Sequence, residues 1–278
     1  NWKVILVLGL SGGIFFPIFK TFKSKVILNP DGAEWKRAKW NLFIKKFLKV
    51  SERIGIYFSD HVISDNLVIS KEIYSNYGIS STIAEYGGDH VKNIMITEET
   101  LKKYNLTNKG YAFKVCRIEP ENNLDIILEA FIKTEIQLIL VGNWNNSSYG
   151  KNLKNKYSQY SNLLLLDPIY EQSVLDELRG NCRLYIHGHS VGGTNPSLVE
   201  AMHLGLCCLV FDVNYNRETT DDNAIYFKDK NELILQLKSL WHDEKKIEEV
   251  KENMYNFARK RYTWKKIIAI YQSVFDKI

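Results

Sequence analysis

The feature that most constrains the fold of this chain is the alternation of short, continuous Val, Ile and Leu runs with segments of helical period. Strands of a parallel sheet carry such runs because their side chains are buried on both faces of the sheet. The alternation occurs in two blocks, separated by a charged stretch at residues 97–110 that we interpret as a linker. The sequence therefore predicts two doubly wound α/β domains with a cleft between them.

The spacing of the apolar residues sets the expected limits of each element. In the first block we expect strands at residues 4–10, 26–29, 61–64 and 82–86, and helices at 34–57 and 71–77. In the second block we expect strands at residues 111–117, 136–141, 163–166, 183–187 and 207–211, and helices at 123–134, 172–179 and 196–204. Three helical segments are expected to end the chain.

The first apolar run allows two interpretations. A short apolar core after one lysine is typical of a signal peptide. The same run also fits a buried strand, a glycine turn and the start of a helix. Gly12, Gly13 and Pro17 interrupt it, and another apolar strand follows at 26–29, so we favour the strand. The run is too interrupted to span a bilayer, and we expect the chain to start inside a domain.

Composition excludes several classes of function. The net charge of +5 is too small to indicate a nucleic-acid partner, although a local basic patch could attract anionic ligands or lipids. The four cysteines form no CxxC pair, and three lie in runs that we interpret as buried strands. They are therefore expected to be reduced core residues of a cytoplasmic protein, and the sequence predicts no metal site.

Residues 187–202 carry the clearest chemical signal, because glycines here connect an expected buried strand to an expected helix. Asn195 is a favourable N-cap for that helix. We expect the backbone amides of Thr194, Asn195 and Ser197 to be free. Together with the helix dipole they would form an anion site suited to a diphosphate. Gly193 has no side chain, so it would allow the diphosphate to come close to the backbone. Glu200, about one turn into the helix, could accept hydrogen bonds from the vicinal hydroxyls of a ribose.

The alternative for this run is a glycine loop that binds nothing. Two histidines, His187 and His189, flank a glycine at the carboxyl end of the expected strand, just before the capped helix. This convergence favours a ligand site, in which the histidines could touch a sugar or a phosphate. A histidine at the end of a strand is otherwise usually structural.

The same run, HGHSVGGTNPSLVEAM, resembles the donor-binding signature of the family 4 retaining glycosyltransferases, and more narrowly that of the capsule and O-antigen rhamnosyltransferase subgroup. Three further segments share the resemblance, which covers the whole chain: CRIEPENN at 116–123, NPDGAEWKR at 29–37 and EYGGD at 85–89. The chain departs from the family pattern at Gly192, where the family has a glutamate, and at Asn122, where it has a lysine. The family's first strand and glycine loop are absent, so we expect the first domain to be incomplete.

The resemblance implies a GT-B fold with a first, acceptor-side domain at residues 1–96 and a nucleotide-sugar domain at 110–263. It also implies that the last helix, at 264–278, crosses back onto the first domain; the alternative is that this helix extends the outer layer of the second. The implied reaction transfers rhamnose or another hexose from a dTDP- or UDP-linked donor, with retention and without a metal or cofactor. The implied acceptor is a polyprenyl-diphosphate-linked saccharide, and the implied location is the inner face of the cytoplasmic membrane.

The resemblance assigns roles to four residues, Arg117, Asn122, Asp31 and His189. Arg117 and Asn122 lie in the expected second diphosphate loop, where a guanidinium can form bidentate contacts to phosphate. Asp31 could position the acceptor hydroxyl or stabilise positive charge on the donor sugar, and His189 could contact that sugar. The alternatives are a surface ion pair of Arg117 with Glu119 or Glu121, and an ordinary Asp-Gly turn at Asp31.

Residues 33–50 combine lysines and an arginine with four large aromatic side chains. A basic aromatic helix can lie on an anionic membrane surface, and a lipid-linked acceptor would favour that interpretation. A solvated helix with an aromatic core face is the alternative.

Two rival functions also fit the pattern as a whole, a nucleotide-sugar epimerase and a donor-binding module without catalytic activity. Product analysis with and without an acceptor would separate the epimerase from a transferase.

Overall fold

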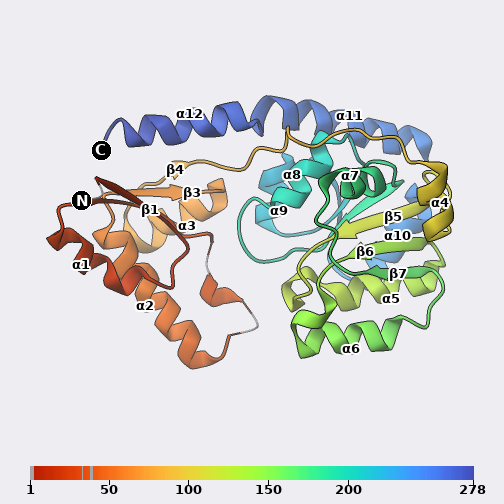
Figure 1. Ribbon diagram of the computed structural model, residues 1–278, viewed down its shortest axis with the longest axis horizontal. Helices are drawn as coiled ribbons and strands as arrows, with labels where there is room; N and C mark the ends of the chain where they lie inside the picture. Colours follow the sequence, from red (N-terminus) through yellow and green to blue (C-terminus); the bar gives the residue numbers. More distant parts are fainter. Residues whose placement is uncertain (1–2, 33, 38–39) are drawn as a thin grey trace.

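The computed structural model describes residues 3–32, 34–37 and 40–278. Within these ranges the strands form two parallel sheets, which lie toward opposite ends of an elongated molecule (Figure 1). The two doubly wound α/β domains predicted from the sequence are confirmed. Ala33 and Lys39, which belong to the basic segment expected at 33–50, lie outside the described residues.

The first sheet has the strand order β1-β2-β3-β4, and its strands are β1 (Val4–Leu8), β2 (Lys25–Asn29), β3 (His61–Ser64) and β4 (Thr82–Ile83). Val4 pairs in register with Lys25 and Leu8 with Asn29, so the first apolar run is a strand, as we interpreted it. The helices around this sheet are η1 (Gly13–Phe15), α1 (Phe16–Thr21), η2 (Glu34–Lys36), α2 (Leu42–Phe58) and α3 (Leu67–Tyr77).

Asparagine caps decide where two of these helices begin. The helix expected at 34–57 is divided, because Asn41 caps α2 by accepting a hydrogen bond from the amide of Ile44. Similarly, Asn66 accepts from the amide of Val68 and starts α3 four residues before the expected limit. A short amide side chain that satisfies an unpaired helix amide fixes a helix start more strongly than apolar periodicity does.

The second sheet has the order β10-β9-β8-β5-β6-β7. Its strands are β5 (Tyr111–Val115), β6 (Gln137–Val141), β7 (Leu163–Leu166), β8 (Leu184–His187), β9 (Cys208–Phe211) and β10 (Ile225–Phe227). Most of the buried apolar side chains of the protein pack around this sheet in one continuous cluster. The cysteines are unpaired, and burial raises the pKa of the Cys207 thiol to about 12.

The helices of the second domain are α4 (Glu98–Tyr104), η3 (Pro120–Asn122), α5 (Leu124–Thr134), η4 (Trp144–Asn146), α6 (Ser148–Tyr157), α7 (Gln172–Gly180), α8 (Pro196–His203), α9 (Asn214–Thr220), α10 (Lys230–Leu240) and α11 (Glu244–Arg261). The stretch at 97–110 that we interpreted as a linker contains a helix, because α4 occupies half of it. Thr97 caps α4 by accepting from the amide of Thr100, and Glu98 and Glu99 favour its amino end. The expected elements also omitted α6, α9 and β10.

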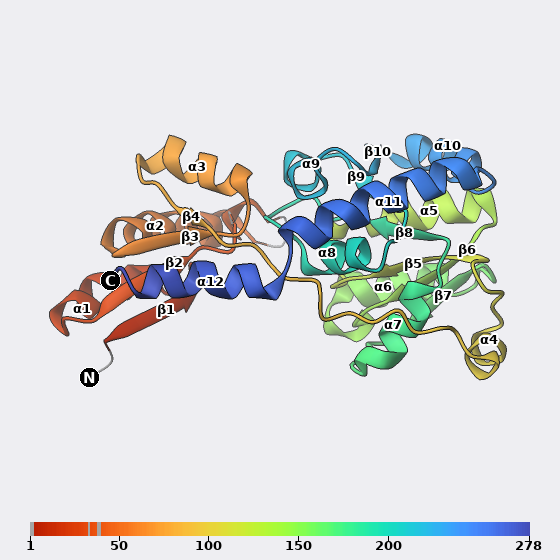
Figure 2. The ribbon, with the colours of Figure 1, turned by 90° about the horizontal axis from the view of Figure 1, so that it is seen from above.

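The last helix, α12 (Trp264–Phe275), leaves the second domain and runs along the first sheet (Figures 1 and 2). Val274 is buried in a cluster with Ile27, Ile63 and Ala84 of the first domain. At the other end of the helix, the amide of Trp264 donates to Asp89 Oδ1 at 2.8 Å. The helix thus ties the two domains together. Among the described residues, no helix is long and apolar enough to cross a membrane.

Candidate functional site

The carboxyl ends of the two sheets meet at the junction of the domains, where a pocket of about 600 Å³ lies. Segments that follow β1 and β2 line it from the first domain, and the segment after β5 lines it from the second. Charged and large apolar side chains share its wall, among them Asp31, Glu34, Arg37, Arg117, Trp40, Ile44, Phe47 and Leu48. Ligands of open α/β sheets bind outside the carboxyl ends of the strands, so this pocket is the candidate site.

Asp31 follows β2 and lines the pocket. It has a left-handed backbone with φ of 53°, and its amide donates to Asn29 Oδ1 at 3.1 Å, so the turn considered as the alternative role is also present. Although the carboxylate reaches solvent, the protein around it displaces water and raises its pKa. The guanidinium groups of Arg37 and Arg117 oppose that rise.

Asp65 was missed by the sequence analysis. It follows β3 as Asp31 follows β2, so the two carboxylates lie at the same edge of the first sheet. Asp65 is only 2% exposed, and within the described residues its Oδ1 has no hydrogen-bond partner. Burial, together with the negative charge of Asp31, raises the pKa of Asp65 to about 7. The sequence did contain a signal that could have identified Asp65 as a site residue. Asp65 comes directly after an expected buried strand, and that strand is the next one along the chain after the strand that precedes Asp31.

The glycine loop of the second domain packs against this edge of the first sheet. A Cβ atom placed on Gly193 would lie 2.0 Å from Asp65 Oδ1, and one placed on Gly32 would lie 3.1 Å from the Cα of Gly192. Gly193 therefore allows close approach to a carboxylate of the other domain, whereas we expected it to allow close approach to a ligand. Gly192, which replaces the family's glutamate, has φ of +116° and forms part of this junction.

Helix α8 begins at the end of the glycine loop, where the structure corrects one expectation. The amide of Ser197 is not free, because it donates to Asn195 Oδ1 at 3.1 Å, and the Ser197 hydroxyl donates to the same oxygen at 2.8 Å. The N-cap side chain thus uses one of the three amides assigned to a diphosphate. For the amides of Thr194 and Asn195 no hydrogen bond is described, so these two can still face an anion.

The histidines of the loop are buried and neutral. His187 and His189 are 2% and 7% exposed, and their rings lie 6.3 Å apart. Burial, aided by the positive charge of Lys114, lowers both pKa values, that of His189 to about 4. No hydrogen bond is described for Nε2 of His187 or Nδ1 of His189. At neutral pH these imidazoles can exchange hydrogen bonds with hydroxyl groups but carry no charge for a phosphate.

The loop after β5 presents Arg117 to the pocket. The Arg117 side chain is 60% exposed, and its Nε lies 3.7 Å from Glu119 Oε2, so the ion pair considered as an alternative is present. Asn122 is buried, and its side-chain amide donates to the Arg117 carbonyl at 2.9 Å. The Asn122 side chain therefore shapes the loop that carries Arg117. Arg37 of the first domain reaches the same loop, with its Nη1 3.8 Å from Glu119 Oε2.

Glu200 on α8 has partners that the sequence did not reveal. One carboxylate oxygen pairs with the fully buried guanidinium of Arg179, and the other lies 3.2 Å from His90 Nε2. Arg179 in turn contacts Asp176 at 2.9 Å. The Glu200 side chain is 17% exposed, so it is accessible to a ligand and also balances a buried charge. The expectation of a carboxylate that only faces the cleft is therefore incomplete.

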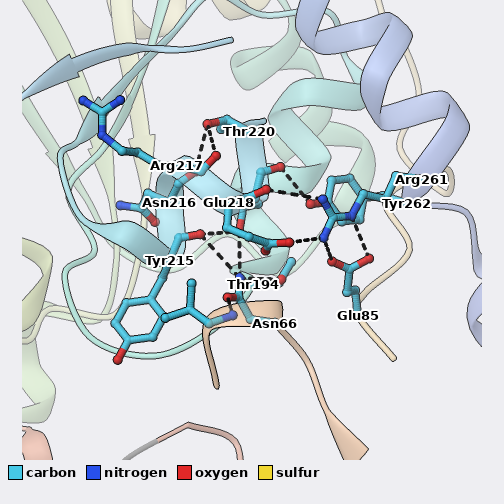
Figure 3. Close-up of polar contacts among 12 residues, drawn as sticks. Asn66, Glu85, Thr194, Tyr215, Asn216, Arg217, Glu218, Thr220, Arg261 and Tyr262 are labelled. Atoms are coloured by element: carbon cyan, nitrogen blue, oxygen red, sulfur yellow. Dashed lines mark hydrogen bonds and ion pairs between the residues drawn. The ribbon is translucent and has the colours of Figure 1, made fainter. Parts of the chain in front are cut away.

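Polar contacts that join the domains include one at Thr194 and another at Arg261 (Figure 3). Asn66 Nδ2 of the first domain donates to Oγ1 of the buried Thr194 at 3.3 Å. Arg261 at the end of α11 lies between Glu85 of the first domain and Glu218 of α9 and pairs with both. These contacts fix the position of the loop relative to the first sheet.

Comparison with known proteins gives two family matches. Residues 96–261 match the model described as glycosyl transferases group 1. Residues 3–89 match a model described as a domain of unknown function, DUF1972. A comparison with curated proteins gives no match.

Solved structures match over nearly the whole chain. Sucrose-phosphate synthase from Thermosynechococcus elongatus has a TM-score of 0.81 at 14% identity, and the match covers 99% of this chain and 74% of that one. HepE from Anabaena, in complex with UDP-glucose, has a TM-score of 0.77 at 14% identity, with 99% and 78% covered. The pneumococcal O-GlcNAc transferase GtfA, in complex with UDP and GlcNAc, has a TM-score of 0.69 at 14% identity, with 98% and 56% covered. These likenesses confirm the GT-B fold.

Proposed function

Because this chain belongs to the group 1 glycosyl transferases, we propose that it moves a hexose, with rhamnose as the first candidate, from a dTDP- or UDP-linked donor to a saccharide acceptor. The observation that carries this proposal is the pocket between the two carboxyl edges. It brings Asp31 of the first domain and Arg117 of the second to one cavity, and Gly32, next to Asp31, lies against Gly192 of the glycine loop. A donor held by the second domain would then present its sugar to an acceptor held by the first.

The donor would be bound through its diphosphate and its ribose. The amides of Gly193, Thr194 and Asn195 at the amino end of α8, with the Ser197 hydroxyl nearby, suit one phosphate. The exposed guanidinium of Arg117 suits the other phosphate. Glu200 would accept hydrogen bonds from the ribose hydroxyls while keeping its contact with Arg179.

The chemical step breaks the bond between the anomeric carbon and the diphosphate oxygen and forms a bond from that carbon to the acceptor hydroxyl oxygen, whose proton passes to the departing diphosphate. Negative charge builds on the departing diphosphate, and Arg117 with the dipole of α8 would stabilise it without a metal ion. Asp31 would orient the acceptor hydroxyl or offset positive charge on the sugar, and His189 would hydrogen-bond to that sugar. The resemblance to the family 4 enzymes is the basis for proposing retention at the anomeric carbon.

A lipid-linked acceptor would explain an exposed apolar surface on α2. Leu42 and Phe43 are 83% and 87% exposed at the start of this helix, and Lys45, Lys46 and Lys49 lie within the next two turns. Such a surface suits peripheral contact with the inner face of the cytoplasmic membrane during synthesis of a surface polysaccharide. Leu42→Ser with Phe43→Ser should reduce cosedimentation with anionic vesicles while leaving UDP binding unchanged.

The proposed function is tested by incubating the protein with UDP- and dTDP-linked sugars, with and without an isoprenyl-diphosphate-linked saccharide. Transfer should require the acceptor, should be lost in Asp31→Asn and should persist in EDTA. Interconversion of the donor sugar without an acceptor would show an epimerase. Binding of the donor with no turnover under any condition would show a module without catalytic activity. Loss of activity in EDTA with rescue by a divalent ion would refute the metal-independent step.

A further inference from the structure

Two guanidinium groups, one from each domain, share a single carboxylate at the inter-domain pocket. Arg117 Nε lies 3.7 Å and Arg37 Nη1 lies 3.8 Å from the same atom, Glu119 Oε2. The Arg117 side chain is largely exposed, whereas the Arg37 side chain is 6% exposed. Because one carboxylate balances one charge, closer pairing of Glu119 with either arginine weakens its pairing with the other.

Arg37 is held in place by its own carboxylate partners. Its Nε lies 2.8 Å from Glu34 Oε2, and its Nη1 lies 4.0 Å from Glu121 Oε1. Three carboxylates thus surround the buried guanidinium, which makes a further anion a poor competitor for it. Arg117 has only the long contact with Glu119 among the described ion pairs and is free to turn toward a ligand.

We infer that Arg37 is a positioning residue for donor binding, because it draws Glu119 away from Arg117 and so leaves the Arg117 guanidinium to the donor diphosphate. The inference rests on the proposed function, since it needs a diphosphate beside Arg117. Arg37 belongs to the first domain and Glu119 to the second, so the diphosphate site reaches full affinity only when the domains are docked. Arg37 itself touches neither donor nor acceptor.

The test is calorimetric titration of UDP, dTDP, UMP and dTMP into four forms of the full chain: the unchanged protein, Glu119→Gln, Arg37→Met and the double variant. Glu119→Gln should bind the diphosphates about 2- to 5-fold more tightly, which corresponds to the loss of one exposed competing ion pair. Arg37→Met should bind them at least about 3-fold more weakly. The double variant should match Glu119→Gln within about twofold, because Arg37 acts only through Glu119. The monophosphates should change less than about twofold throughout.

Glu252→Gln on α11 is the control, since it also removes one carboxylate charge and Glu252 is exposed, with no described contact with Arg37, Glu119 or Arg117. It should leave diphosphate affinity within about twofold. If Arg37→Met fails to fold, Glu119→Gln carries the test alone. Unchanged UDP affinity in Glu119→Gln, with a loss in Arg117→Lys, would overturn the inference and leave the proposed function intact. A double variant as weak as Arg37→Met would also overturn it. If neither UDP nor dTDP binds the unchanged protein, the proposed function falls and this inference falls with it.

Discussion

Replacement of Glu200 should affect both nucleotide binding and stability, and the structure allows the two effects to be separated. Glu200→Ala removes a charged acceptor from the proposed ribose site, which should weaken UDP binding by roughly 1–3 kcal/mol, or about 5- to 150-fold. It also removes one of two carboxylates from the fully buried Arg179. Breaking a buried pair costs about 3–5 kcal/mol, but Asp176 remains and Glu200 is partly exposed, so we expect a stability loss of about 1–3 kcal/mol.

The assay pairs UDP titration calorimetry with urea unfolding, and Asp176→Asn is its control. Asp176 contacts the same guanidinium and is 1% exposed, so its replacement should destabilise the protein without changing UDP affinity in the folded fraction. A Glu200→Ala protein that loses stability but binds UDP as tightly as before would refute the ribose role. Inorganic pyrophosphate has no ribose, so its affinity should not change in Glu200→Ala.

Three further predictions concern the diphosphate, pH and the docking of the domains. Arg117→Lys should lower affinity for UDP more than for UMP, because lysine lacks the planar fork; equal losses would place Arg117 away from the second phosphate. The pKa of Asp65 is about 7 in the folded protein, against about 4 in the unfolded chain. At low pH the buried carboxyl is protonated and does not destabilise the folded state. As pH rises from about 4 to about 7, the folded state loses up to about 4 kcal/mol of stability. Urea unfolding at pH 5 and pH 8 should therefore show a smaller decline for Asp65→Asn than for the unchanged protein, and identical declines would contradict the shift. Deletion of residues 264–278 should expose the first sheet and speed protease cleavage within 97–110, whereas an unchanged rate would mean that α12 does not hold the domains together.

The family resemblance and the local pattern located the site region better than they located its contacts. The glycine loop, the cap at Asn195 and the arginine after β5 could all be found from the sequence, because each depends on residues within a few positions of one another. Asp65 and Arg37 were not chosen as site residues. Their importance comes from partners more than 80 positions away, Gly193 and Glu119 respectively, and spacing along one strand or helix carries no information about such partners.

The sequence by itself determined the two parallel sheets, because the apolar period of a strand and that of a helix are local properties of the chain. It also determined the capped start of α8 at Asn195, since capping is decided within one turn. Only the tertiary structure decided that Gly193 meets Asp65, that Glu200 balances Arg179 and that Arg37 shares Glu119 with Arg117. The contacts of Gly193 with Asp65 and of Arg37 with Glu119 arise only when the two domains pack against each other. The pair of Glu200 with Arg179 forms within the second domain, where separate helices bring a buried guanidinium and a carboxylate together.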